Sequence, residues 1–330
     1  MGVMIDGVWQ VEEPVDLHQN GRFKFPDSVV RNWITPDGAP GPTGVGGFKA
    51  EAGRYHLYIS HACPWAHRTM ILRSLKGLED AISVSVVNLF KGDRGWTFDE
   101  GDGVAPDPIF GADNLWEIYQ ASDPAYTGRV SVPVLWDKAS NTMVNNESSE
   151  IIRMFNGSFD AIATHRGRDY YPEPLRAEID TVNDRVFRTV NIGVYKSGFA
   201  KSQEAYAEAV TALFETLDWL ENRLAQQRYL AGDQITEADW RLFTTLLRFD
   251  PVYHGHFKCN IRRLVDYPNL WNYTRELYQV PDVEGTVNHY HIKQHYYFSH
   301  INVNPTQLVP LGPEIDYSEP HDRERLQKAA

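Results

Sequence analysis

Residues His61–Thr69, with the sequence HACPWAHRT, place a cysteine between a short apolar run and an amphipathic segment. Upstream, the aromatic and branched run Tyr55–Ile59 is typical of a buried strand. Downstream, apolar residues recur at helical spacing over residues 66–78, which predicts a helix. Cys63 therefore lies at the start of this helix. Pro64 fits the first helical turn, because its missing N–H costs nothing there.

The sequence around Cys63 predicts a reactive thiol. Unpaired backbone N–H groups and the positive end of the helix dipole face this position, and both lower a thiol pKa and favour the thiolate. Ala66 takes the place of the second cysteine of a Cys-x-x-Cys pair, so any disulfide of Cys63 must form with an outside thiol. The alternative is a buried structural cysteine, since free cysteines are often buried. The position between a strand and a helix favours the nucleophile.

The composition indicates a globular protein of about two domains. The chain has 330 residues, 42% of them apolar, which is ample for hydrophobic cores. Its two cysteines, Cys63 and Cys259, exclude a disulfide framework and suit a reducing compartment, and we expect Cys259 to be structural. No apolar run reaches membrane-spanning length and the first residues lack signal-peptide features, so we expect a cytoplasmic location without membrane contact. The net charge of −12 argues against nucleic-acid binding.

The first part of the chain contains a long segment without periodicity. Residues 11–53 are rich in glycine and proline, which predicts an extended arm over the surface, with disorder as the alternative. After the segment around Cys63, Ala81–Val87 alternates like a strand, and a strand, helix, strand unit implies parallel pairing. The long loop 91–124 carries Trp96, which is either packed in the fold or in contact with a ligand.

Two later segments offer backbone groups for binding. The pattern of Arg129–Trp136 predicts a strand. Pro133, near its start, interrupts the hydrogen bonds of the β-ladder and leaves backbone groups of the neighbouring residue available to bind something else. Asn145–Glu150 precedes an apolar run and predicts a helix start, whose free N–H groups can hold a carboxylate. Capping of the helix alone is the alternative interpretation.

The second half of the chain is predicted to be helical. Apolar residues recur at helical spacing over 175–190, 206–224 and 270–277. Thr236 and Asp239 form a capping-box pattern that starts a further helix. Tyr195 follows the first apolar stripe and is expected at the end of that helix. The histidine-rich run 289–297 could suggest a metal, but no carboxylate or cysteine completes a tetrahedral set, so we expect no metal and interpret the run as the lining of an organic pocket.

The order of these features resembles the cytosolic glutathione transferases. A Cys-Pro segment is followed by Val132-Pro133, then by Glu147-Ser148, and then by helices with the capping box. Within that superfamily, the segments 63–66 (CPWA), 95–98 (GWTF), 129–137 (RVSVPVLWD) and 248–253 (RFDPVY) resemble the Xi class, the glutathionyl-hydroquinone reductases. The motif Cys-Pro-x-Ala alone would also fit Omega-class thiol transferases, but the long arm and the extra C-terminal stretch favour Xi.

The resemblance implies a fold and a division of the chain. The implied fold class is α/β plus all-α, with an N-terminal thioredoxin-like domain of mixed sheet and flanking helices and a C-terminal helical glutathione transferase domain. The predicted parts are an extended arm (1–53), the thioredoxin-like glutathione-binding domain (54–160), a linker (161–171), the helical substrate domain (172–300) and a C-terminal extension (301–330).

The resemblance also implies roles for individual residues. Cys63 matches the nucleophile, and Trp96 matches the indole that lies against glutathione. The backbone of Val132 pairs with the tripeptide beside a cis Pro133, Glu147 and Ser148 hold its γ-glutamyl end, and Arg129 is the basic residue beside it. The predicted glutathione site also includes Val130 and Ser131, and the tyrosines that face the sulfur and the substrate hydroxyls are Tyr195, Tyr253 and Tyr296.

The implied activity is glutathione-dependent reduction of glutathionyl-hydroquinones to hydroquinones. A mixed disulfide between Cys63 and glutathione is resolved by a second glutathione, with oxidised glutathione released. Glutathione is the co-substrate, no metal or nucleotide is expected, and a homodimer is implied. Two alternatives stay open, an Omega-like thiol transferase or dehydroascorbate reductase, and a non-catalytic module that binds glutathione or a quinone.

Overall fold

The computed structural model describes residues 2–11 and 17–327, which form two compact units. The first unit contains the described residues of 2–11, 27–168 and 286–295. The second contains 17–26, 169–285 and the described residues from 296 onward. Compared with the predicted domains, the unit built around Cys63 also includes residues 286–295, and the helical unit also includes residues 17–26.

The first unit is built on a four-stranded mixed sheet with the order β6-β5-β7-β8. Its central strand β5 (Tyr55–Ile59) is buried along its whole length and pairs in parallel with β6 (Ile82–Val86). On its other side β5 pairs antiparallel with β7 (Val134–Asp137), which pairs antiparallel with β8 (Thr142–Asn145). The predicted strand before Cys63 and the predicted parallel pairing are both confirmed.

Strand β7 is shorter than the sequence pattern predicts. The apolar alternation begins at residue 129, whereas the strand begins at Val134, directly after Pro133. Proline has no N–H to donate to a ladder, so regular pairing starts only beyond it. The Val132–Pro133 peptide bond is cis. Residues 129–133 therefore form a loop at the end of the sheet.

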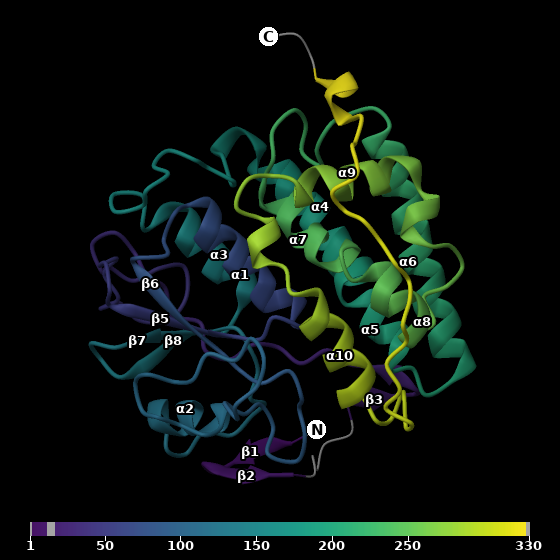
Figure 1. Ribbon diagram of the computed structural model, residues 1–330. Coiled ribbons are helices and arrows are strands. Elements are labelled where there is room, and N and C mark those ends of the chain that lie inside the picture. Colours follow the sequence, from purple (N-terminus) through teal and green to yellow (C-terminus); the bar gives the residue numbers. More distant parts are fainter. Residues whose placement is uncertain (1, 12–16, 328–330) are drawn as a thin grey trace. The chain divides into compact units, whose positions relative to one another are not determined.

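Helices cover both faces of this sheet (Figure 1). α1 (Pro64–Leu75) and α3 (Ser148–Gly157) pack against each other over one face, and α2 (Leu115–Ser122) lies over the other. The predicted helix after Cys63 ends at Leu75, three residues before the last apolar residue of its pattern.

The predicted arm contains local structure and pairs with the sheet. β1 (Val3–Ile5) and β2 (Val8–Gln10) form a hairpin in the first unit, and β3 (His18–Gln19) and β4 (Arg22–Phe23) form one in the second. Residues 28–35 run beside β8, where the N–H of residue 32 donates to the carbonyl of residue 144. The predicted arm also includes residues 1 and 12–16, and the predicted extension includes 328–330; these lie outside the described residues.

The second unit is helical, as predicted. The stripe over 206–224 forms the long helix α6, and the stripe over 175–190 forms α4 followed by a π-helical turn. The capping box is formed, with Asp239 accepting from the N–H of Thr236 at 2.7 Å. The helical segments are α4 (Arg176–Val186), α5 (Gly193–Gly198), α6 (Gln203–Leu224), α7 (Glu237–Leu246), α8 (His254–His256) and α9 (Pro268–Tyr278), with π-helical turns at Phe187–Asn191 and Phe249–Tyr253 and 3-10 turns at Glu173–Leu175, Leu264–Asp266 and Arg323–Leu326. The last helix, α10 (His289–Ser299), begins in the first unit and ends in the second, and a 3-10 turn, Glu284–Thr286, precedes it.

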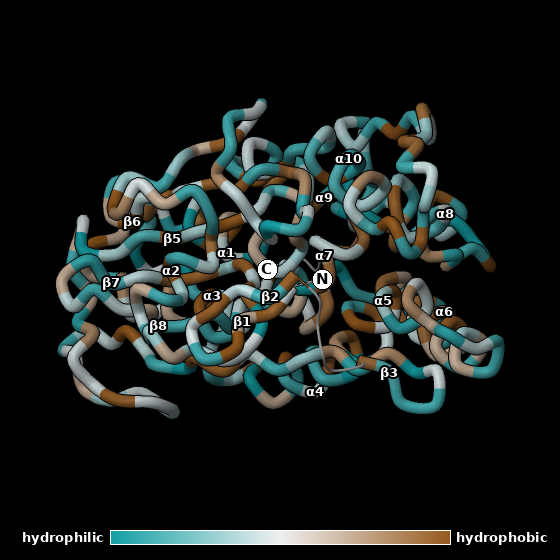
Figure 2. The backbone as a smooth tube through the Cα atoms, turned by 90° about the horizontal axis from the view of Figure 1, so that it is seen from below, coloured by the Kyte–Doolittle hydropathy of each residue, from teal (hydrophilic) through white to brown (hydrophobic). Residues whose placement is uncertain are grey.

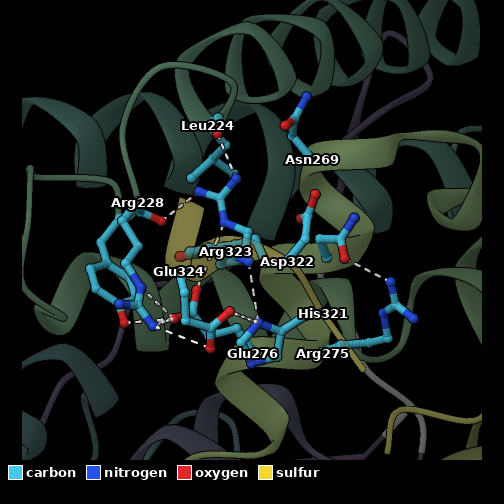
Figure 3. Close-up of polar contacts among 12 residues, drawn as sticks. Leu224, Arg228, Asn269, Arg275, Glu276, His321, Asp322, Arg323 and Glu324 are labelled. Carbon is cyan, nitrogen blue, oxygen red and sulfur yellow. Dashed lines mark hydrogen bonds and ion pairs between the residues drawn. The ribbon is translucent and has the colours of Figure 1, made fainter. Parts of the chain in front are cut away.

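Arg323 fixes the end of the described chain to the helical unit (Figure 3). Its guanidinium is fully buried and donates to the carbonyl oxygens of Leu224, the last residue of α6, at 2.6 Å and of Arg228 at 2.6 Å. A third bond goes to the carbonyl of Gln227 at 2.8 Å. A cation that satisfies the last carbonyls of a helix also complements the helix dipole. The C-terminal segment therefore contributes to the stability of this unit.

Hydrophobic and hydrophilic stretches alternate along the backbone (Figure 2). Among the described residues, no helix combines the length and the apolar character that crossing a membrane requires.

Candidate functional site

Cys63 occupies the N-cap position of α1, between β5 and the first helical turn. Pro64 is the first helical residue, as the sequence predicts. The thiol is partly exposed, and its Sγ lies 3.5 Å from the carbonyl oxygen of Val132. Because a helix N-terminus favours a thiolate, this position suits a nucleophile or a mixed disulfide.

The other cysteine has the opposite environment. Cys259 is fully buried, and burial raises the pKa of its thiol to about 12. Its Sγ lies 3.8 Å from the carbonyl oxygen of Phe257 and 4.0 Å from that of Val194. A buried thiol with a raised pKa is inert at neutral pH, which leaves Cys63 as the candidate nucleophile among the two cysteines.

The loop of residues 129–133 presents backbone groups beside Cys63. Among the described residues, no hydrogen bond is formed by the N–H of Val132, although its carbonyl faces the Cys63 thiol. An extended peptide laid against this residue could pair with both groups, as a strand pairs with a sheet edge. Val130 is buried in this loop, and Arg129 is partly exposed.

Tyr119, which sequence reasoning missed, holds this loop in place. Its buried hydroxyl donates to the carbonyl of Ser131 at 2.8 Å and accepts from the N–H of the same residue at 3.2 Å. The same hydroxyl accepts from the side-chain amide of Asn146 at 3.3 Å. One phenol thus joins the loop to the β8–α3 corner, where Glu147 lies. No local pattern marks this tyrosine, because its partners are 12 and 27 residues away.

Glu147 is the N-cap of α3 and carries a negative charge. Its carboxylate accepts from the N–H of Ser149 at 3.0 Å and from the hydroxyl of Ser149 at 2.8 Å. Burial opposes ionisation, but these hydrogen bonds and the positive charge of Arg68 hold the pKa of Glu147 below its ordinary value. The carboxylate can therefore bind an ammonium group. Buried Ser148 begins the helix and receives a long hydrogen bond from Arg68 at 3.4 Å.

Trp96 is buried, with only 6% of its surface exposed. Its indole stacks on the ring of His295, with centroids 4.9 Å apart and an interplanar angle of 24°. The ammonium of Lys91 lies 5.3 Å from the centroid of the indole. Packing, one of the two roles expected for this residue, is thus observed directly. Its partner His295 is 199 positions away in sequence, which is why no local pattern could find it.

The three predicted tyrosines of the helical unit form a hydroxyl cluster. The hydroxyl of Tyr296 lies 2.5 Å from that of Tyr195 and 3.0 Å from that of Tyr253. Tyr296 and Tyr253 are buried, whereas Tyr195 is partly exposed. Burial raises the pKa of Tyr296 well above its ordinary value, so this phenol keeps its proton. The cluster can hold and donate a proton.

The position of Tyr195 differs from the sequence prediction. The residue lies in α5, a separate short helix that follows the π-helical turn 187–191, and not at the end of the preceding helix. Aromatic rings surround it, with centroids 5.5 Å away for Phe257, 6.1 Å for Phe25 and 6.2 Å for Phe199. Tyr195 therefore lies within an aromatic cluster of the helical unit.

Two histidines of α10 lie within hydrogen-bond distance of backbone carbonyl oxygens. His291 lies 2.6 Å from the carbonyl oxygen of Asp102, and His295 lies 2.7 Å from that of Leu89. Within the described ranges, no group of three histidine, cysteine or acidic side chains has a geometry that could hold a metal ion.

Comparisons with known proteins cover both units. The family model "Glutathione S-transferase, N-terminal domain" matches residues 62–157, and "Glutathione S-transferase, C-terminal domain" matches residues 203–276. Glutathionyl-hydroquinone reductase YqjG of Escherichia coli (strain K12) is 55% identical, over 98% of this chain and 99% of that protein. Glutathionyl-hydroquinone reductase PcpF of Sphingobium chlorophenolicum is 53% identical, over 95% of this chain and 96% of that protein.

Solved structures also match over nearly the whole chain. The glutathione-bound structure of YqjG matches with a TM-score of 0.91 and 54% identity, over 98% of this chain and 99% of that one. An Xi-class glutathione transferase from Natrialba magadii matches with a TM-score of 0.89 and 46% identity, over 99% of this chain and 97% of that one.

Proposed function

The chain belongs to the glutathionyl-hydroquinone reductases, the Xi class of glutathione transferases, and we propose that it reduces glutathionyl-hydroquinones to hydroquinones with Cys63 as the nucleophile. The observation that carries the proposal is the position of Cys63. Its thiol is partly exposed at a helix N-terminus, and Ala66 stands where a Cys-x-x-Cys pair would have its second cysteine. The other cysteine, Cys259, is buried, and its pKa is raised.

In the first half-reaction the Cys63 thiolate attacks the sulfur that joins glutathione to the aromatic ring. A sulfur–sulfur bond forms between Cys63 and glutathione, and the carbon–sulfur bond breaks. Its electron pair stays on the ring carbon, which takes up a proton and leaves as the hydroquinone. The ring is reduced by two electrons, and the two sulfurs are oxidised to a mixed disulfide.

In the second half-reaction the thiolate of a free glutathione attacks the glutathione sulfur of the mixed disulfide. Oxidised glutathione leaves, and the Cys63 thiolate is restored. Because the hydroquinone leaves before the second glutathione reacts, the scheme is of the ping-pong type. Glutathione is the co-substrate, and the cycle uses neither a metal nor a nucleotide.

The proposed glutathione site lies in the first unit. The backbone of Val132 pairs with the cysteinyl part of the tripeptide, and the amide N–H that forms no bond among the described residues supports this role. Glu147 binds the γ-glutamyl ammonium, and Ser148 binds the γ-glutamyl carboxylate at the start of α3, where helix N–H groups favour anions. The site is completed by Trp96, Arg129, Val130 and Ser131.

The proposed proton donor is Tyr195. It is the partly exposed member of the hydroxyl cluster, and its proton can be replaced through Tyr296, whose phenol is 2.5 Å away. Tyr253 and Tyr296 are the proposed supporting tyrosines, whose hydroxyls orient Tyr195 and return its proton through the cluster.

The assay that tests the function compares two substrates. Purified protein is supplied with glutathione and either glutathionyl-menadiol or dehydroascorbate, with Cys63→Ala as the control. We expect menadiol to be released by the wild-type protein and not by the variant. Turnover of dehydroascorbate alone would favour an Omega-like thiol transferase or dehydroascorbate reductase, and turnover of neither would favour a non-catalytic binding module.

We further propose a homodimer that works in the cytoplasm. Neither Cys63 nor Cys259 forms a disulfide among the described residues, which suits a reducing compartment.

A further inference from the structure

The extended arm reaches the proposed glutathione site through one residue, Ser28. Its hydroxyl lies 3.1 Å from Oε2 of Glu147 and 3.1 Å from the carbonyl oxygen of Asn146. A serine hydroxyl has one proton to donate, and a hydrogen bond to an ionised acceptor is stronger than one to a neutral carbonyl. The carboxylate is therefore the favoured acceptor.

The arm around Ser28 is held firmly in the first unit. The N–H of Asn32 donates to the carbonyl of Val144 at 2.9 Å, and the N–H of Asn146 donates to the carbonyl of Val30 at 3.1 Å. Arg31 adds an ion pair with Glu150. These contacts fix the segment beside β8 and bring Ser28 to the N-terminus of α3.

The hydrogen bonds of Glu147 are divided unequally between its two oxygens. Oε1 accepts both bonds from Ser149, while Oε2 accepts the bond from Ser28. Each carboxylate oxygen offers two lone-pair positions. Among the described residues, the hydrogen bonds therefore use both lone pairs of Oε1 and one lone pair of Oε2. The second lone pair of Oε2 can accept a bond from a ligand, and the bond from Ser28 orients it.

We infer that Ser28 is a positioning residue for substrate recognition, orienting the Glu147 carboxylate to receive the ammonium of the γ-glutamyl group. The inference rests on the proposed function, because it concerns the same glutathione site. Without the Ser28 hydroxyl, Oε2 loses its hydrogen bond to the arm, and the carboxylate can turn about the bonds that Ser149 makes to Oε1. The effect therefore falls on ligands that carry the ammonium group.

Isothermal titration calorimetry with two ligands tests this inference. One ligand is glutathione, and the other is its analogue with a glutaryl group in place of γ-glutamyl, which lacks the α-amino group. Ser28→Ala removes the hydroxyl and Ser28→Thr retains it. The matched control is Ser158→Ala, since Ser158 also ties the arm to the α3 segment, donating to the carbonyl of Ile34 at 2.8 Å, but at the opposite end from Glu147.

We expect Ser28→Ala to weaken glutathione binding by roughly fivefold to twentyfold, which is less than the loss of a direct hydrogen bond to a charged group, because Ser28 acts on the ligand only through Glu147. Binding of the analogue is expected to stay unchanged, Ser28→Thr to restore the glutathione affinity, and Ser158→Ala to affect neither ligand.

Two results would overturn the inference alone. In one, Ser28→Ala binds glutathione as the wild type does; in the other, it weakens both ligands equally, which would mean that the hydroxyl does not act on the ammonium. A wild-type protein that binds no glutathione would overturn the proposed function as well.

Discussion

Replacement of Tyr195 by phenylalanine tests the proposed proton transfer to the ring carbon. The substitution keeps the aromatic ring, which packs beside Phe257 and Phe199, and removes only the hydroxyl that lies 2.5 Å from Tyr296. If Tyr195 is the general acid, the first half-reaction is expected to slow by roughly 10²–10⁴. Exchange of the Cys63 adduct with free glutathione involves no proton transfer to carbon, so its rate is expected to change little.

The variant Tyr296→Phe supplies the matched comparison. Tyr296 is buried and joins the other two hydroxyls, so in this role it orients Tyr195 and returns its proton. Loss of one such hydrogen bond is worth about 1 kcal/mol, or roughly fivefold in rate. The first half-reaction should therefore slow far less in Tyr296→Phe than in Tyr195→Phe.

Stopped-flow measurements separate the two half-reactions. The first is followed as release of menadiol from glutathionyl-menadiol in a single turnover, and the second as loss of the isolated mixed disulfide on mixing with glutathione. Equal slowing of both half-reactions in Tyr195→Phe would refute its role as the acid and leave it as a residue that positions glutathione. Equal effects of the two variants on the first half-reaction would assign the proton to the cluster rather than to Tyr195.

Three further predictions concern stability and assembly. Replacing Arg323 by methionine leaves the buried carbonyl oxygens of residues 224, 227 and 228 without their donor. Urea titration is therefore expected to show a free energy of unfolding lower by about 2–4 kcal/mol, against less than about 1 kcal/mol for the exposed control Arg325→Met. Equal losses in the two variants would refute the stabilising role of Arg323. Burial lowers the pKa of His56 to about 4 from an ordinary value of 6.5, so the unfolded chain takes up the proton first. Stability should fall by about 1.4 kcal/mol per pH unit as the pH falls from about 6.5 to about 4, and His56→Asn should flatten this dependence; an unchanged slope in urea titrations at several pH values would contradict it. Light scattering at micromolar concentration is expected to give a dimer, and a mass near 37.7 kDa would show a monomer.

Local patterns in the sequence predicted the parts of the fold whose cause is local. The strand Tyr55–Ile59 and the helix that follows Cys63 rest on the spacing of apolar residues, and the capping box of Thr236 rests on hydrogen bonds within one turn. Strand β7 was predicted too long, since apolar alternation continues through residues that Pro133 keeps out of the ladder. Tyr195 was placed in the wrong helix, because a π-helical turn interrupts the segment without a change in its apolar pattern.

The site was predictable only in part, for the same reason. Cys63 is identified by its own motif, whereas the roles of Trp96 and Glu147 came from the resemblance to a family. The contacts of Tyr119 with Ser131 and of Ser28 with Glu147 join residues that are 12 and 119 positions apart. Such contacts depend on how the chain folds back on itself, and no pattern within one element reports them.

The most direct test of the account is the identity of the cysteine that takes up glutathione. Wild-type protein is mixed with one equivalent of glutathionyl-menadiol in the absence of free glutathione, quenched in acid, digested and examined by mass spectrometry. We expect one glutathionyl group on the peptide that contains Cys63, released menadiol in equal amount, and neither product from Cys63→Ala. An adduct on Cys259, or release of menadiol without any adduct on the protein, would contradict the mechanism.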